Sequence, residues 1–186
     1  NYASWHQAIP LFDALNIKAT FFTNTAPLAD CASDNTIRKY YDRIGFHGER
    51  TPLRSEQIRE LFDLGHEIGC HGHQHLPLAQ VPLEEANSDI ESNLQILTEI
   101  LGTKPEHFAF PFGMPRFFSS TLSEKCVQAG FRSISYATPC MHFTKYNPLS
   151  LQRSLWRLEQ TPSYNIESIC IDGSLMTALT GRSAIG

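Results

Sequence analysis

The chain has 186 residues, which is enough for one domain with its own hydrophobic core. Hydrophobic residues make up 41% and charged residues 18%, which excludes a disordered chain. The formal net charge of −4 excludes a basic surface for nucleic acid, and no stretch approaches the roughly 20 apolar residues of a transmembrane helix.

The N-terminal part of the chain predicts two helices and one strand. Apolar residues at helical spacing predict a helix over residues 3–15, and residues 17–23 read as a short buried strand. Residues 25–51 are rich in Asp, Asn, Gly and charge, and we expect a long, partly helical excursion there. The next helix is expected over residues 56–64, with Ser55 as its N-terminal cap.

From this point helices and strands alternate. Residues 66–70 predict a strand that leads directly into a cluster of histidines, His71, His73 and His75. The later elements are a helix over 82–101, a strand over 107–110, a helix over 119–129, a strand over 131–136, a strand over 155–158 and a helix over 165–180.

Strands that alternate with helices predict a parallel sheet built from βαβ units, in one α/β domain. The pattern fits either an open sheet or an irregular barrel. In both architectures functional sites collect at the carboxyl ends of the strands. The histidines, the Pro111-Phe112-Gly113 turn and the pair Asn24-Thr25 all follow predicted strands, so we expect them at one site.

The histidine cluster indicates a metal site. If the strand gives way to a helical turn at Cys70, His71 and His75 lie on one face and both can reach one metal ion, while His73 points elsewhere. If the segment stays extended, all three histidines share a face. We favour the turn because Gly72 and Gln74 are poor strand residues. Imidazole ligands suit zinc, cobalt, nickel, iron or copper, and a carboxylate would complete a hydrolytic site.

Three segments resemble the polysaccharide deacetylases of the NodB-homology, carbohydrate esterase family 4 type. The segment from Gly65 to His75 reads Gly-His-Glu-Ile-Gly-Cys-His-Gly-His-Gln-His and is similar to the second motif of that family. Residues 17–22, Ile-Lys-Ala-Thr-Phe-Phe, are similar to the strand after the first helix, and residues 108–113, Phe-Ala-Phe-Pro-Phe-Gly, to the third motif. The resemblance spans roughly residues 2–160, in the order that the family has.

The resemblance implies a distorted (β/α) barrel and a divalent metal, with zinc favoured, that is held by Asp-His-His. Within that site it implies that His71 and His75 are the two histidine ligands, and that the Phe112 N–H stabilises the oxyanion. Pro111, Phe112 and Gly113 are then expected to contact substrate, with Pro111 and the Phe112 ring against the acetyl methyl group. The implied substrate is an N-acetylated glycan.

The first family motif, an Asp-Asp pair that supplies the third metal ligand and the general base, does not occur in the 186 residues. The helix over 3–15 is what normally follows that motif. We therefore expect the pair, and the first strand of the barrel, just before Asn1. Residues 1–186 are then a single deacetylase-like domain that is incomplete at its N-terminus.

Two further positions depart from the family pattern. Gly72 stands where Ser or Thr is usual, so that a side-chain hydrogen bond that steadies the histidine loop is missing. Ala109 replaces an arginine that orients the catalytic Asp in many members. Arg153 either takes over this catalytic role or is a solvated arginine at a strand end.

Two functions follow from these features. The first is a metal-dependent hydrolase that removes acetyl groups from N-acetylated sugars of a polysaccharide. The alternative is a degenerate, non-catalytic carbohydrate-binding domain of the same fold. The resemblance suggests a secreted or periplasmic protein, but the residues themselves leave the compartment and the oligomeric state open. We expect the five cysteines to be buried free thiols: Cys31, Cys70, Cys126, Cys140 and Cys170.

Overall fold

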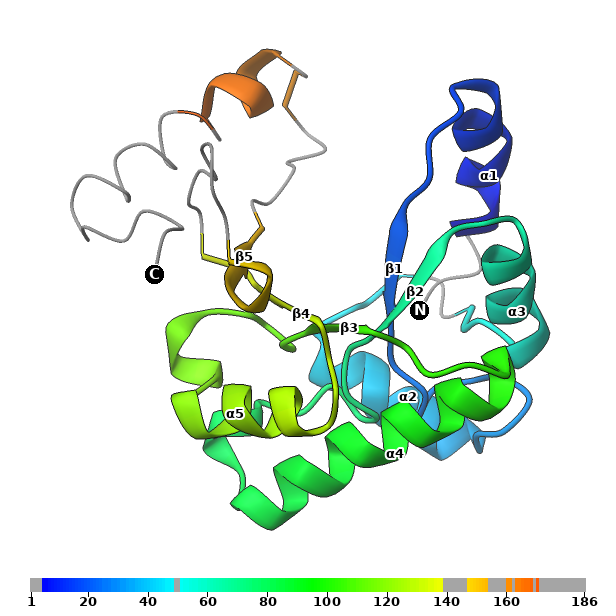
Figure 1. Cartoon of the computed structure of the whole chain (residues 1–186). Coiled ribbons are helices and arrows are strands. Elements are labelled where there is room, and N and C mark those ends of the chain that lie inside the picture. The colour runs from blue at the N-terminus through cyan, green and yellow to red at the C-terminus, as the bar shows by residue number, and fades with distance from the viewer. Residues whose placement is uncertain are drawn as a thin grey trace.

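The computed structural model of the protein describes residues 5–48, 51–138, 147–153, 160–161, 163–168 and 170. Within these residues five parallel strands form one sheet, in the order β1-β2-β3-β4-β5 (Figure 1). Each strand pairs with the next one along the chain, without the reversal of strand order that a doubly wound sheet has. The strands are β1 (Thr20–Thr23), β2 (Glu67–Cys70), β3 (His107–Ala109), β4 (Ser133–Tyr136) and β5 (Leu151–Gln152).

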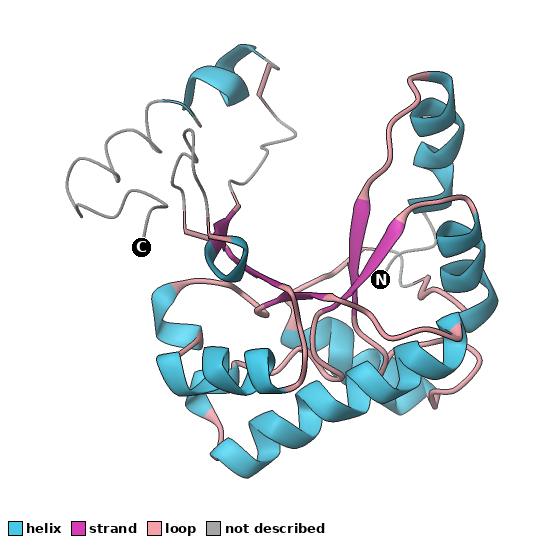
Figure 2. Cartoon of the chain, viewed as in Figure 1, coloured by secondary structure: helices cyan, strands magenta, loops and turns pink. Residues whose placement is uncertain are grey.

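This singly wound order is that of a (β/α) barrel and confirms the α/β prediction. Helix α3 packs against β2 and α4, and α4 packs against α5. In Figure 2 these helices lie below and to the right of the strands. The helices are α1 (Trp5–Ala14), α2 (Asp34–Arg43), α3 (Ser55–Asp63), α4 (Leu83–Leu101) and α5 (Ser120–Gln128).

The two faces of the sheet differ because alternate residues of a strand point to opposite sides. Ile68, Phe108 and Ile134 are almost fully buried and belong to the core that the helices cover. On the other face, alternate residues such as Phe22 and Ser135 line an open pocket of about 680 Å³. The sheet therefore has a covered outer face and an open inner face.

The last predicted elements are only partly represented in the structure. Strand β5, a two-residue strand over Leu151–Gln152, was not predicted, because so short a segment has no recognisable apolar pattern. The predicted strand over 155–158 lies outside the described residues. Residues 163–168 are helical, and the rest of the predicted helix over 165–180 lies outside the described residues, apart from residue 170.

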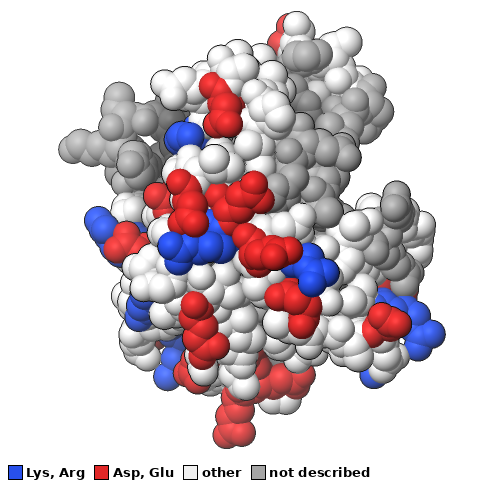
Figure 3. Space-filling model, turned by 90° about the vertical axis from the view of Figure 1, so that its right-hand side faces the viewer, with Lys and Arg blue, Asp and Glu red and all other residues white. Residues whose placement is uncertain are grey.

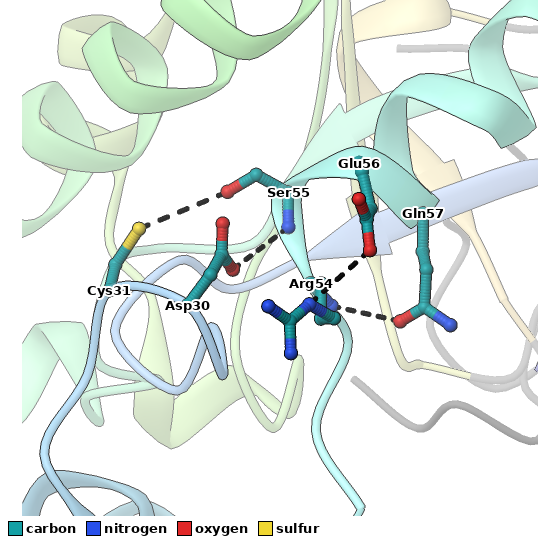
Figure 4. A network of polar contacts seen from close by, with 6 residues as sticks. All are labelled: Asp30, Cys31, Arg54, Ser55, Glu56 and Gln57. Carbon is teal, nitrogen blue, oxygen red and sulfur yellow. Dashed lines mark hydrogen bonds and ion pairs between the residues drawn. The ribbon is translucent and has the colours of Figure 1, made fainter.

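The start of α3 differs from the prediction, since Ser55 is its first residue and not its cap. The Ser55 N–H donates to Asp30 Oδ1 at 3.0 Å, and the Arg54 N–H donates to Gln57 Oε1 at 2.9 Å (Figure 4). Burial acts to raise the pKa of Asp30, but hydrogen bonds from Ser55 and the charge of Arg54 outweigh it and lower the pKa. The cap thus comes from a loop about two dozen residues away in sequence, which no local pattern reveals.

The cysteine prediction is confirmed at two positions and wrong at two others. Cys70 and Cys126 are buried free thiols, and burial raises the pKa of Cys126 to about 12. Cys31 and Cys170 are free but exposed. Cys140 lies outside the described residues.

Charged side chains of both signs share the surface. On the face shown in Figure 3, Lys and Arg side chains are interspersed with Asp and Glu. Ion pairs of this kind join Arg59 to Asp63 at 2.9 Å and Arg132 to Glu106 at 2.8 Å. Among the described residues, none of the helices has the length and apolar character that crossing a membrane requires.

Candidate functional site

The histidine turn, residues His71–His75, follows the carboxyl end of β2. The strand ends at Cys70, and Gly72 then adopts a left-handed conformation with φ of 74°. This turn brings the rings of His71 and His75 together, with centroids 4.9 Å apart and an interplanar angle of 76°. The extended alternative does not occur. The chain does turn after Cys70, although the turn is not helical.

The hydrogen bonds of His71 fix its tautomer. Its Nδ1 lies 2.6 Å from the carbonyl oxygen of Ala109 at the end of β3. A carbonyl oxygen only accepts, so Nδ1 carries the proton and Nε2 keeps its lone pair. Burial, followed by the proximity of His75, lowers the pKa of His71 well below its usual value. His71 is therefore a neutral imidazole whose Nε2 is available as a ligand.

His75 is held among aromatic rings. Its ring centroid lies 4.6 Å from that of Phe112 and 6.4 Å from that of Tyr40, both at nearly perpendicular angles. Burial lowers the pKa of His75 to about 4. Its Nδ1 is buried and has no hydrogen-bond partner among the described residues. A neutral imidazole with an unsatisfied nitrogen fits a metal ligand better than a structural histidine.

His73 points away from this pair. Its Nδ1 lies 2.9 Å from Thr25 Oγ1, and its carbonyl oxygen accepts a hydrogen bond from the Ala26 N–H at 2.9 Å. These contacts tie the histidine turn to the loop that follows β1. His73 therefore stabilises the turn and lies beside the His71–His75 pair without taking part in it.

Asn24 and Tyr40 also hold the turn. The Asn24 side-chain amide donates to the carbonyl oxygens of His71, at 2.5 Å, and of Gly72, at 2.8 Å. The Tyr40 hydroxyl donates to Asn24 Oδ1 at 3.0 Å and so orients the amide. The carboxyl ends of β1 and β2 therefore meet at one site, as the positions of Asn24 and the histidines predicted.

Residues of α4 take the place of the missing side chain at Gly72. Asp89 Oδ2 accepts from the His73 N–H at 2.9 Å, and Oδ1 accepts from the Gln74 N–H at 2.7 Å. Asn93 Oδ1 accepts from the His71 N–H at 2.9 Å. The histidine turn is thus steadied by distant side chains, although residue 72 has none to offer.

Phe112 reaches the histidine pair from the end of β3. It has a left-handed backbone with φ of 59°, which a non-glycine residue rarely adopts. Its N–H takes part in none of the hydrogen bonds of the described residues. Strained residues of this kind, with a cost of about 1–3 kcal/mol, cluster at functional sites. The Phe112 N–H is therefore available to a ligand.

Pro111 and Gly113 flank this strained residue. Pro111 lies close to Gly72, since a Cβ added at residue 72 would contact Pro111 Cγ at 3.5 Å. Gly113 has φ of 65° and packs so closely on Ala137 that a side chain there would overlap its backbone. Gly113 thus lets the loop after β3 contact the end of β4.

Arg153 lies on the inner face of the sheet, directly after β5. Its guanidinium carbon stands 5.4 Å from the centroid of the Phe22 ring, and burial lowers its pKa. Its Nε is buried without a hydrogen-bond partner among the described residues. Arg153 is therefore partly buried at the end of the strand, and both its catalytic role and its interpretation as a solvated residue stay predictions.

The described residues supply two candidate ligands and not three. Within them, no cluster of three or more His, Cys, Asp or Glu side chains is disposed to hold a metal. His71, His75 and Phe112 were predicted from their sequence motifs, whereas Tyr40 has no such local signal. Asp89 and Asn93 were not predicted either, although they interrupt the apolar stripe of α4 at helical spacing, which is a signal that the sequence contains.

Comparisons with known proteins identify the family and the fold. The sequence pattern of the polysaccharide deacetylase family matches residues 2–134. A peptidoglycan deacetylase of Helicobacter pylori is 30% identical over 95 residues, which are 50% of this chain and 30% of that protein. The chain thus spans about a third of the length of this curated relative.

Solved structures share the fold. The deacetylase PplD of Streptococcus pyogenes, in complex with acetate, superposes with a TM-score of 0.67 at 16% identity, over 89% of this chain and 65% of that one. IcaB from Ammonifex degensii gives a TM-score of 0.64 at 19% identity, over 90% of this chain and 67% of that one. At these low sequence identities, both similarities show the fold alone.

Proposed function

This chain belongs to the polysaccharide deacetylase family, and on that premise we propose that it carries the histidine half of a metal-dependent hydrolase site. The proposed reaction is hydrolysis of the amide bond that joins an acetyl group to a sugar nitrogen of a polysaccharide. The observation that carries the proposal is the pair of neutral, partly buried histidines beside the strained Phe112.

The histidine pair fits a divalent metal, and we propose zinc. His71 offers Nε2 because its Nδ1 is committed to Ala109, and His75 has a buried nitrogen without a partner among the described residues. Bound there, such a metal would polarise the substrate carbonyl and lower the pKa of a water molecule. We propose that the third ligand and the general base come from an Asp-Asp pair that precedes Asn1.

The other residues of the site have separate roles in this proposal. We propose that the Phe112 N–H, which takes part in none of the hydrogen bonds of the described residues, donates to the oxygen that becomes negatively charged during hydrolysis. Such a hydrogen bond stabilises the transition state by about 2.7–4 kcal/mol in other enzymes. Pro111 and the Phe112 ring form an apolar wall for the acetyl methyl group. Arg153 is proposed to orient a catalytic carboxylate, since its buried Nε has no partner among the described residues.

The proposal is tested in the full-length protein by metal analysis and by acetate release from N-acetylglucosamine oligomers. We expect about one Zn²⁺ per chain, and His71→Ala should abolish both metal binding and acetate release. Full acetate release from metal-free protein would refute the proposed mechanism.

The alternative is a non-catalytic carbohydrate-binding domain of the same fold. It is favoured by one observation, namely that the described residues provide no third ligand. Binding of N-acetylglucosamine oligomers without acetate release, in a protein that holds no metal, would support this alternative.

A further inference from the structure

A carboxylate occupies the space beside Gly72. A Cβ built on Gly72 would overlap Asp89 Oδ2. The carboxylate can therefore occupy this position only because residue 72 is a glycine. Asp89 is 4% exposed and is carried by α4, a different element from the histidine turn. A side chain at position 72 would therefore displace the Asp89 carboxylate, which α4 carries.

Asp89 and Asn93 form a polar pair on the buried side of α4. They are four residues apart, so both face the histidine turn. Together they accept from the backbone N–H groups of His71, His73 and Gln74. The Gln74 N–H has only the Asp89 carboxylate as a described acceptor, whereas the His73 N–H also donates to the Asp89 carbonyl oxygen at 3.1 Å.

A buried carboxylate at this position is costly without these partners. Burial raises the pKa of Asp89 to about 6, although the two backbone hydrogen bonds and the charge of Arg43 act to lower it. The neighbouring positions Ala86, Ile90 and Leu97 of α4 are buried and apolar. A hydrophobic residue at position 89 would pack in this core without the cost of burying a charge. The hydrogen bonds to the histidine turn are therefore the reason for a carboxylate at this position.

We propose that Asp89 is a positioning residue that fixes the histidine turn in the conformation that brings His71 and His75 to one ligand. It acts through the backbone of His73 and Gln74 and does not touch the ligand. This inference rests on the proposed function, since the ligand is the metal ion proposed above.

The first test does not depend on metal. Amide hydrogen exchange is measured in the metal-free full-length protein and in its Asp89→Ala and Asp89→Asn variants. Asp89→Ala should speed exchange of the Gln74 amide about tenfold or more, because its acceptor is lost. Leu97→Ala is the matched control, since it removes a fully buried side chain about two turns further along α4. It should lower stability and leave the ratio of the Gln74 exchange rate to that of the α4 amides unchanged.

The second test titrates the same proteins with Co²⁺ and follows its visible absorption. Asp89→Ala should weaken Co²⁺ binding about 10- to 100-fold, and Asp89→Asn, which keeps the size and one acceptor oxygen, should weaken it less. Leu97→Ala should bind Co²⁺ as the wild type does. Unchanged Co²⁺ affinity and unchanged Gln74 exchange in Asp89→Ala would overturn the inference. A wild type that binds no Co²⁺ would instead refute the proposed function, and the exchange data would still decide whether Asp89 holds the turn.

Discussion

The rings of His71 and His75 lie 4.9 Å apart between centroids, and both residues are partly buried. Two positive charges at this distance would repel strongly in a poorly solvated site. Burial lowers the pKa of both residues, and Arg153 lowers that of His71 further. Both imidazoles are therefore neutral at neutral pH, which is the form that binds a metal ion, so protons do not compete with the metal for their nitrogens.

The lowered pKa of His75 predicts how stability depends on pH. Its pKa falls from 6.5 to about 4 on folding, so between these values the unfolded chain binds the extra proton. The free energy of unfolding should therefore rise with pH from about 4 to 6.5, and stay constant above. The full shift corresponds to roughly 3 kcal/mol. Urea unfolding of metal-free protein from pH 4.5 to 7.5 measures it, and His75→Gln should reduce the rise to the part that His71, whose pKa is also lowered, contributes.

Asp89 predicts the opposite trend in the same experiment. Its pKa rises from 3.8 to about 6 on folding, so the folded protein binds the extra proton between these values. This contribution to stability is present at low pH and is lost as the pH rises towards 6. Asp89→Asn should therefore make the rise that His75 causes steeper. An unaltered or flatter profile would contradict the assignment.

Substitution of Gly72 by alanine should lower the free energy of unfolding by more than the strain of its backbone conformation alone explains. Gly72 and Gly45 have similar φ values, 74° and 67°, but a Cβ at Gly45 meets nothing within 4 Å. Gly45→Ala should therefore cost about 1 kcal/mol of backbone strain. Gly72→Ala should cost about 3 kcal/mol, because Asp89 must also move away from its two N–H donors. Equal losses in the two variants would show that the Asp89 contact is unimportant.

A second comparison isolates the strain at Phe112, whose φ is 59°. Phe112→Ala and Phe112→Gly both lose the ring that packs on His75, but only glycine adopts this backbone without strain. Phe112→Gly should therefore be more stable than Phe112→Ala by about 1 kcal/mol in urea unfolding. Both variants keep the N–H, so residual acetate release in both is expected if that group stabilises the oxyanion.

The loop-derived cap of α3 gives a prediction away from the site. Asp30→Ala removes the acceptor of the Ser55 N–H and should cost about 1 kcal/mol in thermal or urea unfolding. Asp30→Asn should retain most of the stability, since its side-chain oxygen still accepts. Asp34→Ala, at an exposed first-turn position of α2, is a control with the same loss of charge.

The sequence pattern identified most strands and helices because each buries an apolar stripe at its own period. Residues 66–70, for example, alternate into the core at Ile68 and Cys70, and the predicted strand is β2. Strand β5 escaped prediction because two residues, one of them Gln152, give no pattern. Ser55 was misread because its hydrogen-bond partner, Asp30, is remote in sequence.

By itself, the sequence determined the class of the fold and the pair of histidines, because local periodicity and close spacing suffice for both. It also located the turn, since Gly72 disfavours continuation of the strand. Only the tertiary structure decided which atoms of these histidines are available. The Ala109 carbonyl fixes the tautomer of His71, and the Phe112 ring packs against His75. Asp89 and Asn93 reach the turn from a helix that begins eight residues after His75, and contacts over such separations depend on chain packing rather than on local sequence.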